Sequence, residues 1–141
     1  MSAARSAASI GAMNLPEIKL AVPVAGWATQ GQYALVEACV GAGTTIPAHV
    51  AKREHVVVHL LDGELDVIVD RSPRRLTSGE TVALERGVPR RLRAVKPSRV
   101  LALIAPAGLE QLLSVVADPA TDPDDRAALL AVGGVQAVPA A

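Results

Sequence analysis

The histidines of this 141-residue chain are concentrated in one short segment. His49, His55 and His59 are the only three, and all lie within the stretch HVAKREHVVVHLL. Histidine changes its charge near neutral pH and is also a common ligand of metal ions. The segment therefore points either to acid–base chemistry or to a metal site.

Short strands are predicted on both sides of these histidines. Segment 32–40 (QYALVEACV) has strand composition, and segment 41–47 (GAGTTIP) is typical of a loop. Segment 55–61 (HVVVHLL) is apolar and β-branched, and segment 64–70 (ELDVIVD) alternates in polarity. Because Asp62-Gly63 between them is a strong two-residue turn signal, the sequence predicts a β-hairpin there.

The strand pattern continues toward residue 106. Turns at 71–75 and 85–89 flank the segment 76–84, and two further strands are predicted at 90–95 and 99–106. Strands recurring at intervals of about eight to twelve residues, separated by turns, are typical of an antiparallel sandwich or barrel.

The last third of the chain has a helical period. Four apolar residues fall on one helical stripe: Leu109, Leu112, Leu113 and Val116. Asp122 can cap a second helix that begins at Pro123 and ends before Gly133. We expect these two short helices to pack against the outside of the sheets or against one open end.

Composition excludes several classes of function. Fourteen Lys and Arg balance fourteen Asp and Glu, and aromatic side chains are nearly absent, so binding of nucleic acid is not expected. The apolar run at 100–107 is too short to cross a membrane. The single cysteine, Cys39, excludes an internal disulfide, and the N-terminal segment lacks a signal-peptide core. A cytoplasmic location is expected.

Two spacings resemble the motifs of the cupin family over about residues 33–105. The first cupin motif places a glycine, a His-x-His pair, a glutamate and a second glycine at fixed intervals, and Gly43, His49 and Gly63 fit it. The second motif places its histidine after two glycines, and Gly79 and Gly87 fit there. The resemblance implies an all-β fold: a cupin-type double-stranded β-helix, or jelly-roll, barrel with two short C-terminal helices.

The family's metal ligands are mostly replaced. In cupins, two histidines and a glutamate of the first motif and a histidine of the second bind a divalent metal. Position by position, these ligands fall on His49, Ala51, Val56 and Arg90. Alkyl groups offer no lone pair, and a guanidinium is permanently protonated. No metal and no other cofactor is therefore expected.

Strand alternation predicts which side chains face the barrel interior. Val56 occupies the family's inward glutamate position, so Val58 shares its face while His55 and His59 point outward. A bulge near His55 could still turn that residue inward. Leu92 has the same parity as Arg90 and is also expected to face inward.

His49 and Arg90 are the candidate catalytic residues. His49 could act as a general base or acid, or it could only hydrogen-bond a backbone carbonyl. A buried Arg90 needs an anionic partner, for which Glu37, Glu85 and a ligand carboxylate or enolate are candidates; alternatively its head lies in water at the barrel mouth.

Six residues are the candidate ligand contacts: Trp27, Tyr33, Glu37, Val56, Val58 and Leu92. Trp27 could cover the barrel mouth, although plain packing is the alternative for a single tryptophan. The expected ligand is a small, largely apolar molecule, and a carboxylate or an enolisable carbonyl on it would match Arg90.

Three functions remain open. The first is a metal-independent enzyme of the isomerase, cyclase, lyase or dehydratase type, with His49 transferring protons and Arg90 stabilising negative charge. The second is a non-catalytic module that binds or senses a small molecule. The third is a metal-dependent dioxygenase or cyclase with a rearranged site made of His49 with His55 or His59.

The chain is expected to form three parts: a flexible arm at 1–14, the barrel at 15–107 and a helical extension at 108–141. The extension resembles the tails of bacterial single-domain cupins, in which a Gly-x-Glu segment, here Gly108 to Glu110, opens a helix. A homodimer is expected, because the leucine-rich helices and the strand VLALIAP supply apolar surface that needs cover.

Overall fold

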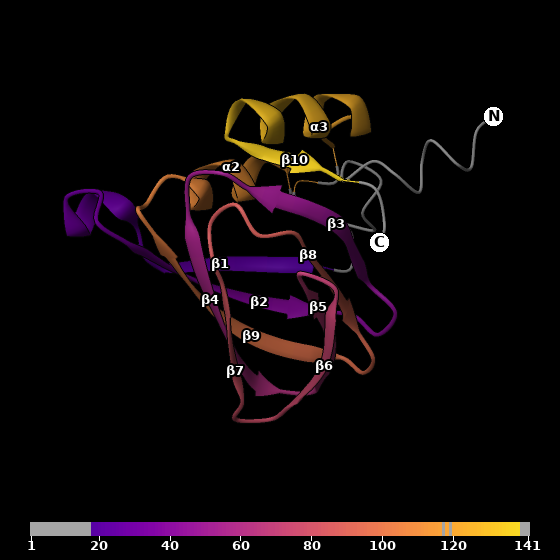
Figure 1. The fold of residues 1–141 in the computed structure, drawn as a ribbon. Helices are drawn as coiled ribbons and strands as arrows, with labels where there is room; N and C mark the ends of the chain where they lie inside the picture. Colours follow the sequence, from indigo (N-terminus) through magenta and orange to yellow (C-terminus); the bar gives the residue numbers. More distant parts are fainter. Residues whose placement is uncertain (1–17, 117, 119, 139–141) are drawn as a thin grey trace.

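The computed structural model describes residues 18–116, 118 and 120–138, and most of them lie in two antiparallel five-stranded sheets (Figure 1). The all-β barrel with two short helices is thereby confirmed. The arm expected at 1–14 lies outside the described residues. None of the helices in the described ranges is long and apolar enough to cross a membrane.

The first sheet has β9 as its central strand. Its strands, in spatial order, are β1 (Ile18–Val24), β2 (Ala34–Val40), β9 (Ser98–Ala105), β4 (His55–Asp62) and β7 (Thr81–Leu84). A short 3-10 helix, η3 (Gly26–Thr29), lies in the connection from β1 to β2. Alternate residues of β2, Ala34, Val36 and Ala38, are buried, so this face of the sheet forms one wall of the barrel interior.

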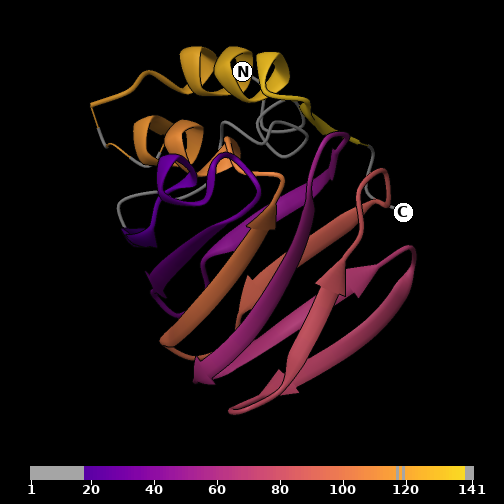
Figure 2. The ribbon, with the colours of Figure 1, turned by 90° about the vertical axis from the view of Figure 1, so that its left-hand side faces the viewer.

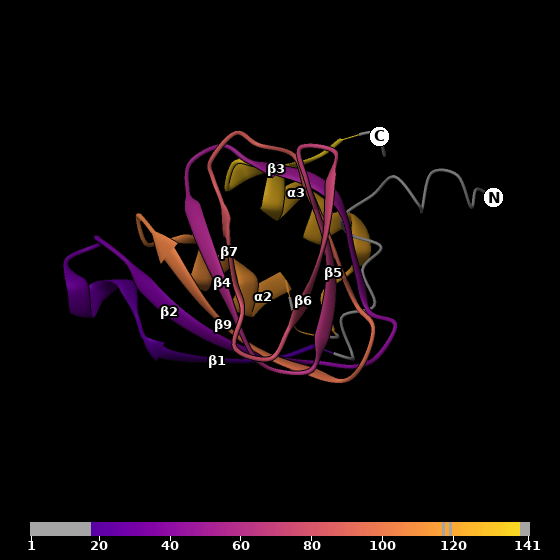
Figure 3. The same ribbon diagram turned by 60° about the horizontal axis from the view of Figure 1, so that its bottom comes forward.

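The second sheet forms the opposite wall. Its strands, in spatial order, are β10 (Val135–Ala137), β3 (Thr45–Ala51), β8 (Arg90–Ala94), β5 (Glu64–Val69) and β6 (Ser72–Thr77). Figure 3 looks along the barrel from the end away from the helices and shows β4, β9 and β2 on one side, with β5 and β6 on the other.

The hairpin predicted at Asp62-Gly63 is wrong. β4 pairs with β7 and β9, whereas β5 pairs with β6 and β8, so the two strands belong to different sheets. Gly63, with φ +114°, is the corner at which the chain crosses from one sheet to the other. A Cβ added there would lie 2.7 Å from the carbonyl oxygen of Pro97, so the crossing needs a residue without a side chain.

The hairpin of this region follows one strand later. β5 and β6 pair in register from Glu64 with Thr77 to Val69 with Ser72. The two residues between them, Asp70 and Arg71, both have positive φ, which is the backbone of a two-residue type I′ turn. Pro73 is tolerated in β6 because β6 is an edge strand.

Both predicted helices are present. They are α2 (Leu109–Val116) and α3 (Pro123–Val132). The Asp122 carboxylate caps α3 by accepting the backbone N–H of Asp124 at 2.8 Å, and Gly133 follows the helix as expected. The extension is not wholly helical, because β10 pairs with β3 and adds a fifth strand to the second sheet.

The helices pack at one end of the barrel. Leu109 and Leu130 join Val36 and Ile104 in one buried cluster, together with Val135 of β10. A second buried cluster, with Leu60, Leu65, Leu76 and other aliphatic residues, fills the opposite half of the barrel. Figure 2 shows α2 and α3 above the strand ends rather than across the sheets.

Candidate functional site

The barrel contains a cavity of about 210 Å³ with an almost wholly aliphatic lining. Both sheets line it through their inward side chains, among them Val36, Val56, Val58, Leu92 and Ala102. Because a cavity of about 150 Å³ can hold benzene, this one has room for a somewhat larger molecule.

The C-terminal extension closes one end of this cavity. Leu109 and Leu113 of α2, Leu130 of α3 and Val135 of β10 all contribute to its lining. The expectation that the helices pack at an open end of the barrel is therefore met, and it links the helical extension directly to the site.

Two polar side chains, His49 and Arg90, face this apolar interior from neighbouring strands. His49 of β3 is the register partner of Arg90 of β8, and both line the cavity. Directly opposed residues on paired strands have Cβ atoms about 5 Å apart, so the imidazole and the guanidinium are neighbours. Buried Thr44 adds a further polar residue to the lining.

His49 is neutral at physiological pH. Its pKa is lowered from 6.5 to about 4, mainly by burial; the positive charge of Arg90 acts in the same direction, and a hydrogen bond to Pro47 acts in the opposite direction. His49 Nδ1 lies 2.9 Å from the carbonyl oxygen of Pro47. A carbonyl only accepts, so Nδ1 carries the proton and Nε2 carries a lone pair.

Arg90 is buried, with 3% of its surface exposed, and its acceptors are backbone oxygens rather than a carboxylate. Its Nε donates to the carbonyl of Val88 at 3.0 Å, and Nη2 donates to the carbonyl of Glu85 at 2.7 Å. Burial lowers the Arg90 pKa from its usual value, and the negative charge of Glu54 opposes that shift. The side chain therefore ties the loop before β8 to the cavity wall.

Glu54 is a charged neighbour of the site that the sequence did not reveal. It lies between β3 and β4, is 5% exposed, and its Oε1 has no hydrogen-bond partner within the described part of the chain. Burial raises its pKa, and the charges of Arg53 and Arg90 partly oppose this. Because Glu54 lies among charged residues in the segment KREH, the sequence gives no indication that its side chain is buried.

The predicted ligand contacts divide into two groups. Val56, Val58 and Leu92 line the cavity, as strand alternation predicts. Trp27, Tyr33 and Glu37 do not line it. Trp27 lies in η3 and is 83% exposed, Tyr33 is 41% exposed, and Glu37 points away from the barrel because Val36 and Ala38 take the inward positions of β2. These three residues therefore lie outside the cavity, contrary to the expectation from the sequence.

His55 and His59 lie on the outer face of the first sheet. Their strand neighbours Val56 and Val58 line the cavity, whereas neither histidine does. His55 contacts Arg86, whose backbone N–H and Nε approach the two ring nitrogens at 3.1 and 2.9 Å. A neutral ring has one acceptor nitrogen, so only one of these contacts is a hydrogen bond at a time. His59 Nδ1 lies 2.8 Å from Thr81 Oγ1.

The residues around His49 do not fit a divalent cation. The positions corresponding to the other cupin ligands hold Ala51, Val56 and Arg90, all of which line the cavity and none of which offers a lone pair. In the described ranges no three His, Cys, Asp or Glu side chains are grouped so that they could hold a metal ion. A site combining His49 with His55 or His59 is not formed.

Comparison with known proteins agrees with this geometry. Residues 36–105 match the sequence family described as "Cupin domain". The chain belongs to the cupin superfamily. No curated protein sequence matches this cupin.

Solved structures share the fold of this cupin at low sequence identity. KdgF from Halomonas sp. superimposes with a TM-score of 0.62 at 18% identity, covering 68% of this chain and 84% of that one. Ectoine synthase from P. lautus gives a TM-score of 0.62 at 17% identity, covering 89% and 78%. A predicted oxalate decarboxylase from Thermotoga maritima gives 0.58 at 14%, covering 62% and 79%. At such identities the likeness concerns the fold alone.

Proposed function

We propose that this cupin binds a small, largely apolar molecule in its barrel, with an acidic or carbonyl oxygen directed at Arg90 and His49. The observation that carries the proposal is the lining of the cavity, which is aliphatic except for a few polar groups that include this adjacent pair. Ligand sites of this kind gain affinity from apolar burial and orientation from a few polar groups.

The positive charge of Arg90 favours an anionic ligand over a cationic one. Its two backbone contacts use two of the five N–H groups of the guanidinium, which leaves three that can donate to a ligand. The imidazole of His49 is neutral and adds no opposing charge. A carboxylate beside the buried Arg90 would form charge-assisted hydrogen bonds in a largely apolar setting, where they are strongest.

Proton transfer at His49 is the second candidate function, in an isomerase, cyclase, lyase or dehydratase type of reaction without a metal. The contact of Nδ1 with Pro47 favours it, because this contact fixes the ring and leaves the Nε2 lone pair as a proton acceptor. The pKa of about 4 makes His49 a weak base. A bound carboxylate would raise that pKa toward neutrality.

Thermal melting with straight-chain carboxylates from butanoate to decanoate tests the proposal. The melting temperature should rise with chain length until the cavity is full and then fall, because each buried CH₂ contributes about 0.8 kcal/mol, or roughly a fourfold change in Kd. The primary alcohol of the same length should stabilise less than the carboxylate.

The variant Arg90→Met is the matched control. It should keep the dependence on chain length and lose the preference for the carboxylate over the alcohol. If no member of either series shifts the melting temperature, the proposal is contradicted. Product formed from any of these compounds, followed by NMR in the same samples, would favour the second candidate function.

A further inference from the structure

The first sheet carries aliphatic side chains on both of its faces. The inward residues line the cavity, and the register places Leu35 of β2, Leu103 of β9 and Val57 of β4 side by side on the outer face. Leu101 of β9 lies in the next row, and Ala83 of β7 continues the first row toward the sheet edge. We call these five residues the outer patch. Figure 2 shows no helix across β4 and β9.

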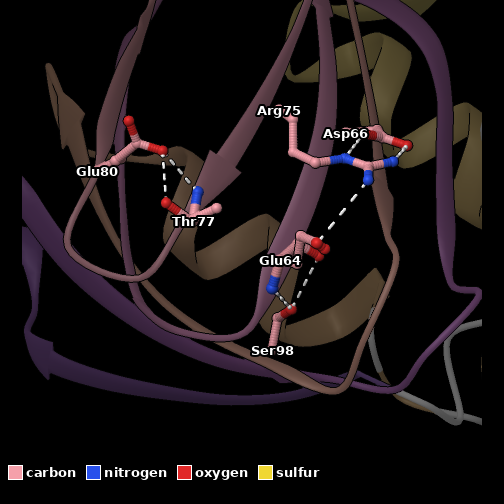
Figure 4. A network of polar contacts seen from close by, with 6 residues as sticks. All are labelled: Glu64, Asp66, Arg75, Thr77, Glu80 and Ser98. Atoms are coloured by element: carbon pink, nitrogen blue, oxygen red, sulfur yellow. Dashed lines mark hydrogen bonds and ion pairs between the residues drawn. The ribbon is translucent and has the colours of Figure 1, made fainter.

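The outer face of the second sheet is different, because it carries ion pairs. Asp66 of β5 has Arg75 of β6 and Arg93 of β8 as its register partners. Arg75 donates to both carboxylate oxygens of Asp66, at 2.8 and 3.1 Å, and lies 3.9 Å from Glu64 (Figure 4). These charged side chains suit a face that is exposed to water. The outer patch of the first sheet, by contrast, consists of aliphatic side chains.

An antiparallel sheet that faces water on one side normally has polar residues there. Apolar side chains on both faces are typical of a sheet that is covered on both sides. The helices do not cover the outer patch, since their leucines pack with Val36, Ile104 and other residues at the cavity end. No residue of the outer patch belongs to either buried cluster of the described chain; Ala83 is exposed and the other four are half-buried.

We propose that a second copy of this chain covers the outer patch. On the outer face, Glu37 of β2 and His59 of β4 stand in the same row on either side of Leu101 of β9. β9 is the central strand, so the acid and the imidazole are placed symmetrically about the middle of the sheet. A surface with this arrangement is complementary to itself.

The direction of the two-fold axis follows from this arrangement. An axis between the two copies that runs along β9 brings β2 of each copy opposite β4 of the other, and therefore Glu37 opposite His59. Because Nδ1 of His59 is engaged with Thr81 Oγ1, Nε2 is the ring nitrogen that can donate to that carboxylate. An axis across the strands would instead place Glu37 opposite Glu37.

The outer face of the first sheet is large enough for a dimer interface when the residues at the end of the sheet are included. The five strands contain 34 residues; at about 3.3 Å per residue and about 4.8 Å between strands they present roughly 540 Å². A standard interface buries about 800 Å² on each partner. The connection from β1 to β2 adds Trp27, 83% exposed, and Tyr33, 41% exposed, at the end of the same sheet. Both residues lie outside the cavity, and aromatic side chains are enriched in interfaces.

Light scattering coupled to size-exclusion chromatography, at tens of micromolar protein, tests the proposal. The wild type should give twice the chain mass of 14.5 kDa. Leu101→Lys should give the single-chain mass with an unchanged circular dichroism spectrum. Ile68→Lys is the matched control, because Ile68 lies on the outer face of the second sheet and this variant should remain a dimer.

Charge reversal tests the axis. Glu37→Lys should raise the dimer Kd at least tenfold, and adding His59→Glu should restore most of the loss. Within one copy, these two residues are two strand spacings apart, about 10 Å, so restoration reports a contact between copies. Failure of the double variant to recover would exclude this axis.

A wild-type mass of a single chain would overturn the proposal, as would a folded Leu101→Lys that stays dimeric or an Ile68→Lys that dissociates equally. If Leu101→Lys does not fold, Leu101→Ser and Leu103→Ser replace it, with an expected rise in dimer Kd of at least tenfold measured by analytical ultracentrifugation. The proposal stands independently of ligand binding in the barrel, because its residues lie on the opposite face of the sheet.

Discussion

At the scale of residues, the chemistry of the site depends on a neutral imidazole beside a buried cation. His49 and Arg90 face each other across paired strands, and neither has a carboxylate as its hydrogen-bond acceptor. Backbone carbonyls hold both side chains instead. The arrangement stores a positive charge in an apolar cavity, where a ligand carboxylate or enolate would be favoured.

The low pKa of His49 predicts a pH dependence of stability. The folded state binds this proton less tightly than the unfolded state, since burial lowers the pKa from 6.5 to about 4. The neutral His49 ring contributes fully to the free energy of unfolding above pH 6.5. About 3 kcal/mol of that free energy is lost as the pH falls toward 4. Urea unfolding of wild type and His49→Gln between pH 7 and pH 4 should show their stability difference changing by that amount.

The variant Glu54→Gln should reveal a pH dependence of stability opposite to that of His49. Burial raises the Glu54 pKa, so the folded state binds this proton more tightly than the unfolded state. Wild-type stability should therefore rise relative to the variant as the pH falls through that pKa.

For His49, a difference in stability between wild type and His49→Gln that stays constant from pH 7 to pH 4 would contradict the assignment of a buried neutral ring.

Side-chain direction at the site was largely predictable from the sequence, whereas long-range burial was not. Alternation along strands predicted Val56, Val58 and Leu92 in the cavity, and the structure places them there. Glu54 was not singled out, because it lies among charged residues and no motif or alternation there indicates burial. Its turn is held by distant segments, since Lys52 donates to the carbonyl of Gly134 at 2.9 Å and Gly87 donates to that of Ala51 at 2.8 Å.

At the scale of elements, the turn at Asp62-Gly63 shows the limit of local signals. A turn-forming pair predicts a reversal of the chain, but it does not determine whether the strands on either side pair with each other. Here β4 is already bonded to β9 and β7 on both edges, so β5 joins the other sheet. By contrast, α3 was predictable, because its cap, its first-position proline and its terminal glycine act locally.

Gly63→Ala should be among the most destabilising single-methyl changes in the barrel. The added Cβ would meet the Pro97 carbonyl at 2.7 Å and the backbone would remain at φ +114°. We expect a loss of at least 2 kcal/mol in the free energy of unfolding. Gly79→Ala is the matched control, since Gly79 also has positive φ but has open space around it, and it should lose about 1 kcal/mol. Equal losses in the two variants would show that the corner is not sterically limited.

At the scale of the whole molecule, the C-terminal extension and the barrel act together. The stripe of leucines predicted a helix with a covered face, but only the fold shows that Leu109, Leu113 and Leu130 cover one end of a cavity. Without them the same barrel would be open to water at that end. The extension thus makes the apolar site possible, and we expect ligand binding to depend on its docking.

The central claim is that the barrel cavity is the ligand site, and filling the cavity tests it most directly. Calorimetric titration of the best-binding carboxylate should show loss of binding, by at least a hundredfold in Kd, in Ala102→Leu, whose larger side chain would occupy the cavity. Ala128→Leu, on the exposed surface of α3, should bind as wild type does. Binding that persists unchanged in a folded Ala102→Leu would place the ligand elsewhere and contradict the account.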